Sequence, residues 1–206
     1  LAATTAALQC DRQATDRYLR DIDSQADALA ADSPDRRPSG ILQIPLPTKV
    51  TRLDPAACAY LDQAEAMSAV FECLTRIGLD ARAAPNLASA IEADSDARRY
   101  RFRLREGVFF HDGGPLQTPD VRWSFERALR EPGSDARRRL QAVRGSRAIA
   151  EGREQGLEGF RTLNEHEFVL ELDEPCPSLP VLLSDACLAI VPRGTEPSPS
   201  GNWREG

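Results

Sequence analysis

The sequence has few of the residues on which metal and nucleophilic chemistry depend. Among its 206 residues are two histidines, His111 and His166, and five cysteines, with no Cys-x-x-Cys pair. A zinc site needs clustered Cys and His ligands at short spacings, so no metal site is expected. The Gly-x-Ser-x-Gly, Gly-x-Gly-x-x-Gly and Walker A patterns are also absent, so we expect neither catalysis nor a bound cofactor.

Lysine is almost missing, and the charge balance is acidic. Lys49 is the only lysine among 26 basic residues, so arginine at surface positions reflects a compositional preference more than a function. With 32 acidic residues the formal net charge is -6. Nucleic-acid binders need a positive field to recruit phosphates, so a nucleic-acid partner is not expected.

No apolar run is long enough to span a bilayer. The small apolar residues 1–10 fit the end of a removed signal or of an upstream membrane helix, so a membrane tether through the N-terminus stays open. Cys10 is a candidate lipidation site, although Gln9 fits poorly before such a cysteine. For the other cysteines the sequence favours buried free thiols, with a pairing of Cys176 and Cys187 as the alternative.

Composition divides the chain near Gly40. Residues 11–30 have apolar positions at helical spacing, and a Pro-, Ser- and Asp-rich linker follows. We therefore predict an N-terminal helix and linker over residues 1–40 and a folded domain over residues 41–206.

Periodicity and turn residues predict a mixed α/β domain with an inserted antiparallel piece. Thr118 is the predicted cap of a helix, with Pro119 and Asp120 in its first turn. A short helix and a return strand are expected between residues 178 and 192. The remaining predicted elements are strands at 41–50, 99–105, 108–110 and 166–175, helices at 64–74 and 136–149, and a short mixed segment with a turn at 83–93.

One predicted strand has an apolar face and an arginine face. Tyr100, Phe102 and Leu104 alternate with arginines at 99, 101, 103 and 105. The arginines form either an anion-binding surface or a solvated face of a sheet.

The stretch YRFRLREGVFFHDGGPLQTPDVRWSFER, residues 100–127, resembles the signature of the extracellular solute-binding proteins of peptide-type ABC transporters, family 5. The Leu-Asp-Pro at 53–55, APNLASAIEADSDARRY at 84–100 and AIVPRG at 189–194 resemble further family blocks in order and spacing. Thr118 is displaced by one position from the family's threonine, and Ile91 stands where the family has tryptophan.

This resemblance implies lobe I of a type II periplasmic-binding-protein-like fold, with an antiparallel sheet subdomain and with the second lobe following residue 206. It implies that the arginine face is solvated. From the residues themselves, the Asp-Gly-Gly turn and the lack of a second His or Cys nearby favour a turn role for His111 over a metal or ligand contact. His166 stands in a turn before a strand and is expected to be exposed. The resemblance also implies the substrate-binding component of an ABC transporter for peptides or similar small solutes. Its partners would be permease subunits, and its location the periplasm or the extracellular face of the cell envelope.

The same resemblance places two segments of this chain at the ligand cleft. The family often has an aromatic residue in the second segment, and its absence here predicts weak peptide binding. For Tyr60, packing in the core is the alternative to lining the cleft. The expected cleft residues are Ala57, Cys58, Ala59, Tyr60 and Leu61 in the first segment, and Ser134, Asp135 and Ala136 in the second.

Two other functions stay open at this point. The first is an extracytoplasmic sensor domain of the same fold, fused to a membrane signalling protein such as a kinase, which suits the N-terminal helix and linker. The second is a degenerate fragment that binds no ligand.

Overall fold

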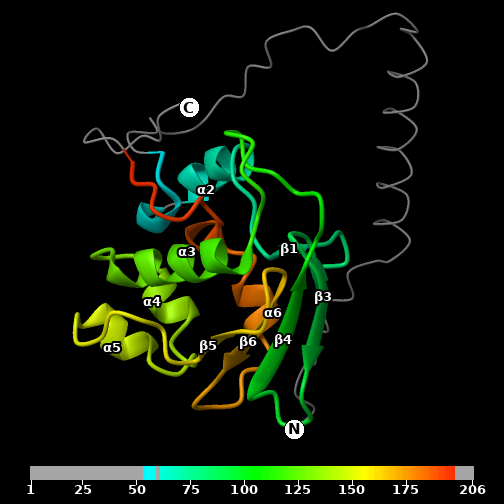
Figure 1. Cartoon of the computed structure of the whole chain (residues 1–206), viewed down its shortest axis with the longest axis vertical. Coiled ribbons are helices and arrows are strands. Elements are labelled where there is room, and N and C mark those ends of the chain that lie inside the picture. Colours follow the sequence, from blue (N-terminus) through cyan, green and yellow to red (C-terminus); the bar gives the residue numbers. More distant parts are fainter. Residues whose placement is uncertain (1–52, 59–60, 198–206) are drawn as a thin grey trace, which may run out of the picture. The chain divides into compact units, whose positions relative to one another are not determined.

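The computed structural model describes residues 53–58 and 61–197; the predicted N-terminal helix, the linker, the boundary near Gly40 and the strand at 41–50 lie outside the described residues. Short helices and antiparallel strands follow one another along the chain (Figure 1). Their bounds are η1 Pro55–Ala57, α2 Leu61–Ser68, β1 Thr75–Ile77, β2 Ala83–Pro85, β3 Ala88–Ala93, β4 Arg99–Leu104, α3 Thr118–Arg130, α4 Ala136–Arg139, α5 Ser146–Ala150, β5 Phe160–Thr162, β6 Glu167–Glu171, α6 Leu179–Leu182 and η2 Ala186–Leu188.

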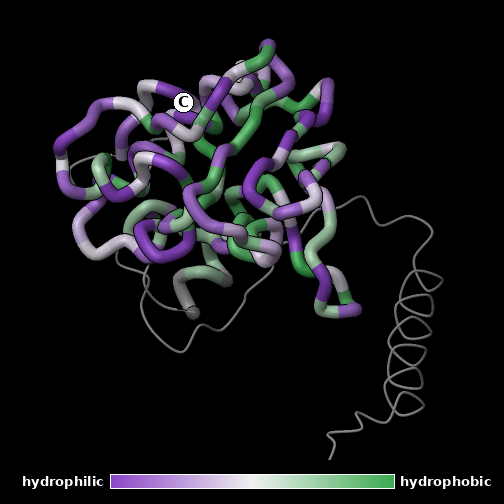
Figure 2. The backbone as a smooth tube through the Cα atoms, turned by 90° about the horizontal axis from the view of Figure 1, so that it is seen from below, coloured by the Kyte–Doolittle hydropathy of each residue, from purple (hydrophilic) through white to green (hydrophobic). Residues whose placement is uncertain are grey.

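A four-stranded antiparallel sheet carries the core. Its strand order is β3-β4-β6-β5, and β1 and β2 form a separate hairpin. Helices α3, α4 and α5 lie on one side of the sheet (Figure 1). In Figure 2 hydrophobic stretches cross the interior and hydrophilic stretches follow the outer loops. This arrangement confirms the predicted mixed α/β class with an antiparallel piece.

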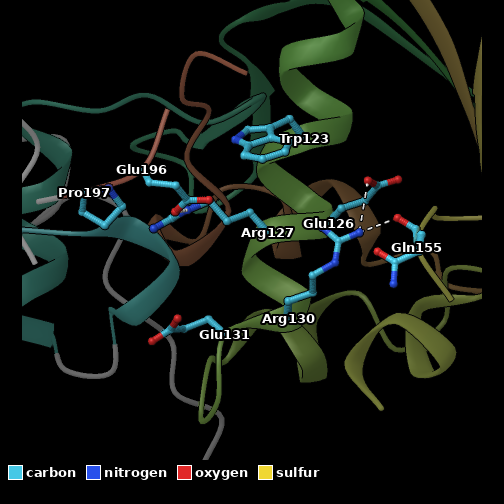
Figure 3. A pocket seen from close by; sticks show the side chains of 8 residues that line it. All are labelled: Trp123, Glu126, Arg127, Arg130, Glu131, Gln155, Glu196 and Pro197. Carbon is cyan, nitrogen blue, oxygen red and sulfur yellow. Dashed lines mark hydrogen bonds and ion pairs between the residues drawn. The ribbon is translucent and has the colours of Figure 1, made fainter. Parts of the chain in front are cut away.

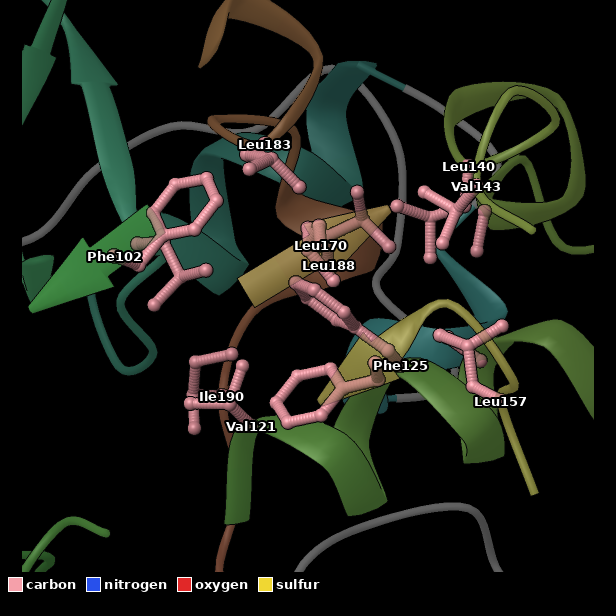
Figure 4. Close-up of a cluster of buried hydrophobic side chains, with 14 of the residues drawn as sticks. Phe102, Val121, Phe125, Leu140, Val143, Leu157, Leu170, Leu183, Leu188 and Ile190 are labelled. Atoms are coloured by element: carbon pink, nitrogen blue, oxygen red, sulfur yellow. The ribbon is translucent and has the colours of Figure 1, made fainter. Parts of the chain in front are cut away.

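Strand β4 has the predicted alternation. Tyr100, Phe102 and Leu104 are at most 2% exposed, and the intervening arginines face outward. Phe102 stacks on Phe168 of β6 with ring centroids 5.0 Å apart, and Phe168 stacks on Phe160 of β5 at 4.6 Å. Helix α3 adds Val121 and Phe125 to the same core (Figure 4). Burial of such rings is the largest favourable contribution available to a domain of this size.

Helix α3 begins at the predicted residue but with a different cap. Gln117 is the N-cap, and its backbone N–H donates to Asp120 Oδ2 at 2.8 Å. The hydroxyl of Thr118, predicted as the cap, donates to the carbonyl of Asn164 at 2.7 Å. The hydroxyl therefore ties the helix start to the β5–β6 turn.

The helix predicted at 64–74 is observed as α2, which begins earlier, at Leu61, and ends at Ser68. The carbonyls of Cys73 and Leu74 accept backbone hydrogen bonds from Leu87 and Ala88. These long-range bonds draw the chain after α2 into extended structure, against the helical pattern.

The single helix predicted at 136–149 is wrong. The chain forms α4 and α5 with a break between them at Gly145, whose φ is 79°. Arg144 N–H donates to the carbonyl of Glu171 in β6. A contact with the sheet therefore interrupts the helix, and glycine supplies the left-handed conformation that the break requires.

Several further elements differ from the prediction. Strands β1, β2, β3 and β5 fall in segments that were not predicted as strands. The predicted return strand near residues 189–192 joins neither described sheet; Ile190 N–H donates to the carbonyl of Glu72 instead. Residues 108–110 form only an isolated bridge, between Phe109 and Pro115.

Candidate functional site

Three polar residues of α3 form one stripe, which we call the α3 stripe: Asp120, Ser124 and Arg127. Their spacing of four and three residues places them on one helical face. Asp120 and Ser124 are buried, and the Arg127 side chain is 10% exposed. Buried polar groups need partners, so the contacts of this stripe indicate what α3 holds in place.

Arg127 binds the loop that contains the first predicted cleft segment. Its Nη1 and Nη2 donate to the two carboxylate oxygens of Asp54 at 2.9 and 2.8 Å, and its Nε donates to Glu196 at 3.0 Å. Burial alone would lower the pKa of Arg127, but the hydrogen bonds and charges of Asp54 and Glu196 outweigh it and raise that pKa. The guanidinium is therefore a permanently charged anchor, without proton-transfer chemistry.

Asp54 has a second structural task. Its side chain is fully buried, and Oδ1 accepts the N–H of Ala56 at 3.1 Å as the cap of η1. One carboxylate thus shapes the start of the loop and attaches it to α3. The chain enters the predicted cleft segment from this fixed point.

Ser124 and Asp120 hold the end of the described chain. Ser124 Oγ accepts the N–H of Val191 at 2.9 Å and donates to the carbonyl of Asp120 at 2.7 Å. Asp120 Oδ1 accepts the N–H of Arg193 at 3.0 Å. The α3 stripe therefore binds two segments that lie far apart in the sequence, the loop at Asp54 and the chain at Val191 and Arg193.

The structure describes only part of the first predicted cleft segment. Ala57 is half-buried and Cys58 is buried, while Ala59 and Tyr60 lie outside the described residues. Leu61 begins α2, and its side chain is not among those described.

The second predicted segment follows the C-terminus of α3. Ser134 and Ala136 are buried, and Asp135 is half-buried. Ser134 Oγ accepts the N–H of Ala136 at 3.3 Å. The guanidinium of Arg137 donates to the carbonyl of Leu129 at 3.1 Å and so caps the end of α3.

The elements that begin or end in the two predicted segments, η1 and α4, contact η2. The segment before residue 58 packs on it through η1, and α4 reaches it through an ion pair of 2.6 Å between Arg139 and Asp185. Asp185 also accepts the N–H of Cys187 at 3.2 Å. The two segments are thus brought into one neighbourhood, while their role at a ligand stays a prediction.

The described cysteines are structural. Cys58, Cys73, Cys176 and Cys187 are free thiols, so Cys176 and Cys187 do not pair. Burial, aided by the charges of Asp185 and Glu72, raises the pKa of Cys73 to about 12, and burial likewise raises the pKa of Cys187. A thiol that keeps its proton is a poor nucleophile and a poor metal ligand.

The arginine face of β4 is solvated and paired. Glu167 of β6 accepts from Arg101 at 2.5 Å and from Arg103 at 2.8 Å. Hydrogen bonds from these two guanidiniums lower the pKa of Glu167. Val169 lies on the same outer face, opposite Arg101, and is only 2% exposed. Long arginine side chains of this kind lie with their apolar stems along a sheet surface while their charged ends meet water.

The histidines form no metal centre. His111 lies exposed in a turn, as predicted. His166 precedes β6 but is half-buried, so the expectation that it is exposed was wrong. Its shielded Nδ1 has no hydrogen-bond partner among the described residues. Within residues 53–58 and 61–197, no group of three or more His, Cys, Asp or Glu side chains is placed to hold a metal ion.

A hollow of about 700 Å³ lies along the outer side of α3 (Figure 3). None of the predicted cleft residues lines it. Its lining consists of Trp123, Glu126, Arg127, Arg130, Glu131, Gln155, Glu196 and Pro197.

Sequence reasoning missed the contacts of the α3 stripe. Asp54 and Arg127 are 73 residues apart, and no local pattern pairs them. An aspartate directly before a proline at a helix start was the available signal that Asp54 acts as a cap.

Residues 82–204, more than half of the chain, match the family model described as "Bacterial extracellular solute-binding proteins, family 5 Middle". The oligopeptide-binding protein OppA of Bacillus subtilis is 29% identical over 110 residues, which cover 52% of this chain and 20% of that protein. The periplasmic oligopeptide-binding protein OppA of Escherichia coli is 26% identical over 163 residues, 77% of this chain and 30% of that protein.

Solved structures agree on the fold. OppA of Burkholderia pseudomallei superposes with a TM-score of 0.65 at 24% identity, over 71% of this chain and 29% of that chain. The pheromone receptor PrgZ gives 0.64 at 23% identity, over 70% and 29%. The fold is therefore the mixed α/β fold of type II periplasmic binding proteins, and the chain spans less than a third of these relatives. No helix in the described part of the chain is long and apolar enough to cross a membrane.

Proposed function

Because this chain belongs to the bacterial extracellular solute-binding proteins of family 5, we propose that it forms part of the substrate-binding component of an ABC transporter. The proposed ligand class is short peptides or similar small solutes, and the proposed partners are permease subunits. The protein would act outside the cytoplasmic membrane, in the periplasm or at the extracellular face of the envelope, with an N-terminal tether. Ligand capture would be non-covalent, without catalysis.

The observation that carries this proposal is the family match over residues 82–204. The names of the relatives support the ligand class, because both OppA proteins are described as oligopeptide-binding. No relative named above is described as a signalling kinase, so the sensor alternative is not carried forward.

The α3 stripe supports a mechanical role for the signature residues. Asp120, Ser124 and Arg127 bind backbone and carboxylate groups of two distant segments. A rigid frame of this kind positions a loop at low entropic cost when a ligand binds. The proposed ligand-contacting residues are those of the two predicted cleft segments, including Tyr60, and the α3 stripe holds the chain just before the first of these segments.

The proposal is tested by binding measurements on the complete protein that contains this chain. Calorimetry with peptides of two to five residues should give saturable binding. Replacing Tyr60 by alanine should weaken it about tenfold, as expected for loss of an aromatic contact. The matched control is Phe109→Ala, which removes an aromatic side chain that is 65% exposed and outside the predicted cleft.

Two results would contradict the proposal. One is a complete protein that retains no peptide or other small solute in native mass spectrometry. The other is sub-micromolar peptide binding by residues 1–206 alone, because closure between two lobes is part of the proposed mechanism.

A further inference from the structure

Helix η2 lies beside both ends of the first predicted cleft segment. The two elements that frame this segment, η1 ending at Ala57 and α2 beginning at Leu61, both contact η2. Asp185 is the N-cap of η2, and its carbonyl accepts the thiol of Cys73 at 3.3 Å. Contacts on both its main chain and its side chain therefore hold Asp185 close to the first segment.

Arg139 connects the second predicted cleft segment to the same place. Helix α4 begins at Ala136, the last residue of that segment, and ends at Arg139. Arg139 Nη2 lies 2.6 Å from Asp185 Oδ2. This ion pair thus stands between the elements that carry the two segments.

The Arg139–Asp185 pair keeps unused hydrogen-bonding capacity. Its two side chains are 29% and 27% exposed, so both are open to solvent in part. The Nε of Arg139 has no hydrogen-bond partner among the described residues, whereas Arg127 uses Nη1, Nη2 and Nε on two carboxylates. Each carboxylate oxygen of Asp185 accepts more than one hydrogen bond, so Cys187 and Arg139 do not exhaust it.

A donor beside an acceptor matches the main chain of an extended peptide. In a strand, the N–H and the carbonyl of one residue point to the same side, and both pair with a single residue of the neighbouring strand. A guanidinium and a carboxylate joined in an ion pair present the same combination. Hydrogen bonds to charged groups are also stronger than those between neutral groups.

We propose that Arg139 and Asp185 bind the main chain of one residue of a peptide ligand. The carbonyl of that residue accepts from the guanidinium, and its N–H donates to the carboxylate. Since the space between the two segments is a ligand cleft only under the proposed function, this site rests on that function. Recognition of the main chain does not depend on the side chain that the ligand residue carries.

Calorimetry on the complete protein that contains this chain tests the site, with tetra-alanine as the probe and with analogues in which each amide in turn is an ester. An ester lacks the N–H, and its carbonyl is a weaker acceptor. One of the esters should bind the wild-type protein about ten-fold more weakly than tetra-alanine. Arg139→Met and Asp185→Asn should each weaken tetra-alanine about ten-fold, and in these variants the same ester should cause little further loss.

The control is Arg147→Met, which makes the same change at the exposed ion pair with Glu151 in α5 and should leave the affinity unchanged. Asp185→Asn keeps an oxygen for the cap of η2, so it carries the test if Arg139→Met does not fold.

Three results would overturn the site. If the losses from the ester and from the variants simply add, the Arg139–Asp185 pair only packs α4 against η2. If the complete protein binds other peptides but not tetra-alanine, main-chain recognition is wrong and the proposed function stands. If it binds no peptide, the proposed peptide ligand and this site fail together.

Discussion

Two sets of arginine–carboxylate contacts in this chain have similar distances and opposite surroundings. Arg127 meets Asp54 at 2.8 Å, with side chains 10% and 0% exposed. Arg103 meets Glu167 at 2.8 Å, with side chains 57% and 14% exposed. The first pair lies on the α3 stripe, and the second lies on the outer face of β4.

The difference shows why a short N–O distance alone says little about how much an ion pair contributes to stability. In water, an ion pair gains little, because solvent screens the charges and the side chains lose freedom. A buried carboxylate has lost its hydration, so it depends on its partner. The α3 stripe therefore fixes the positions of the loop at Asp54 and of the segment at Val191 and Arg193. The arginines on the outer face of β4 only present charge to solvent.

Removal of Arg127, the buried partner of Asp54, should have the largest effect on the free energy of unfolding. Arg127→Met leaves Asp54 buried without its cation, and the free energy of unfolding should fall by about 3–5 kcal/mol. Urea denaturation monitored by circular dichroism measures this change. Arg103→Met makes the same chemical change on the outer face of β4 and should be much milder. Equal losses in the two variants would contradict the comparison.

Loss of a buried hydroxyl should have an intermediate effect. Ser124→Ala removes the acceptor of the Val191 N–H inside the protein, and the free energy of unfolding should fall by about 1–3 kcal/mol. Ser89 is the control, because its exposed hydroxyl also donates to a backbone carbonyl, that of Arg103 at 3.1 Å. A Ser89→Ala loss as large as that of Ser124→Ala would show that burial is not the deciding factor.

The smallest effect on stability is expected for a substitution of Glu167, and this effect should depend on pH. Arg101 and Arg103 lower the pKa of Glu167 in the folded protein. Its contribution is therefore present above the unfolded pKa, about 4.3, and is lost as the pH falls through the lower folded pKa. Glu167→Gln should leave the thermal midpoint at neutral pH nearly unchanged and reduce its dependence on pH below about 4.5. A large fall in the thermal midpoint of Glu167→Gln at pH 7 would show that the contacts of Glu167 with Arg101 and Arg103 stabilise the fold as strongly as a buried ion pair.

Local patterns predicted the elements whose contacts are also local. The alternation in β4 and the Pro-Asp start of α3 are visible in short windows, and both elements formed where expected. The break between α4 and α5 was not visible, because a hydrogen bond from Arg144 to the sheet causes it. The predicted return strand failed for the same kind of reason, since Ser124 and Glu72 bind its backbone elsewhere.

The candidate site was only partly predictable. The resemblance selected Ala57–Leu61 and Ser134–Ala136, and the elements that contain Ala57 and Ala136, η1 and α4, contact η2. It included Arg127 as a matching residue without indicating its partner. Partners separated by 73 residues are a property of the folded chain, and one sequence alone does not contain that pairing.

The double-mutant cycle of Asp54 and Arg127 tests the account most directly, with the cycle of Arg103 and Glu167 measured in parallel. We predict a coupling free energy of about 2 kcal/mol or more for the first pair and a far smaller one for the second. Couplings of the same size would contradict the claim that the α3 stripe is the anchor of this fold.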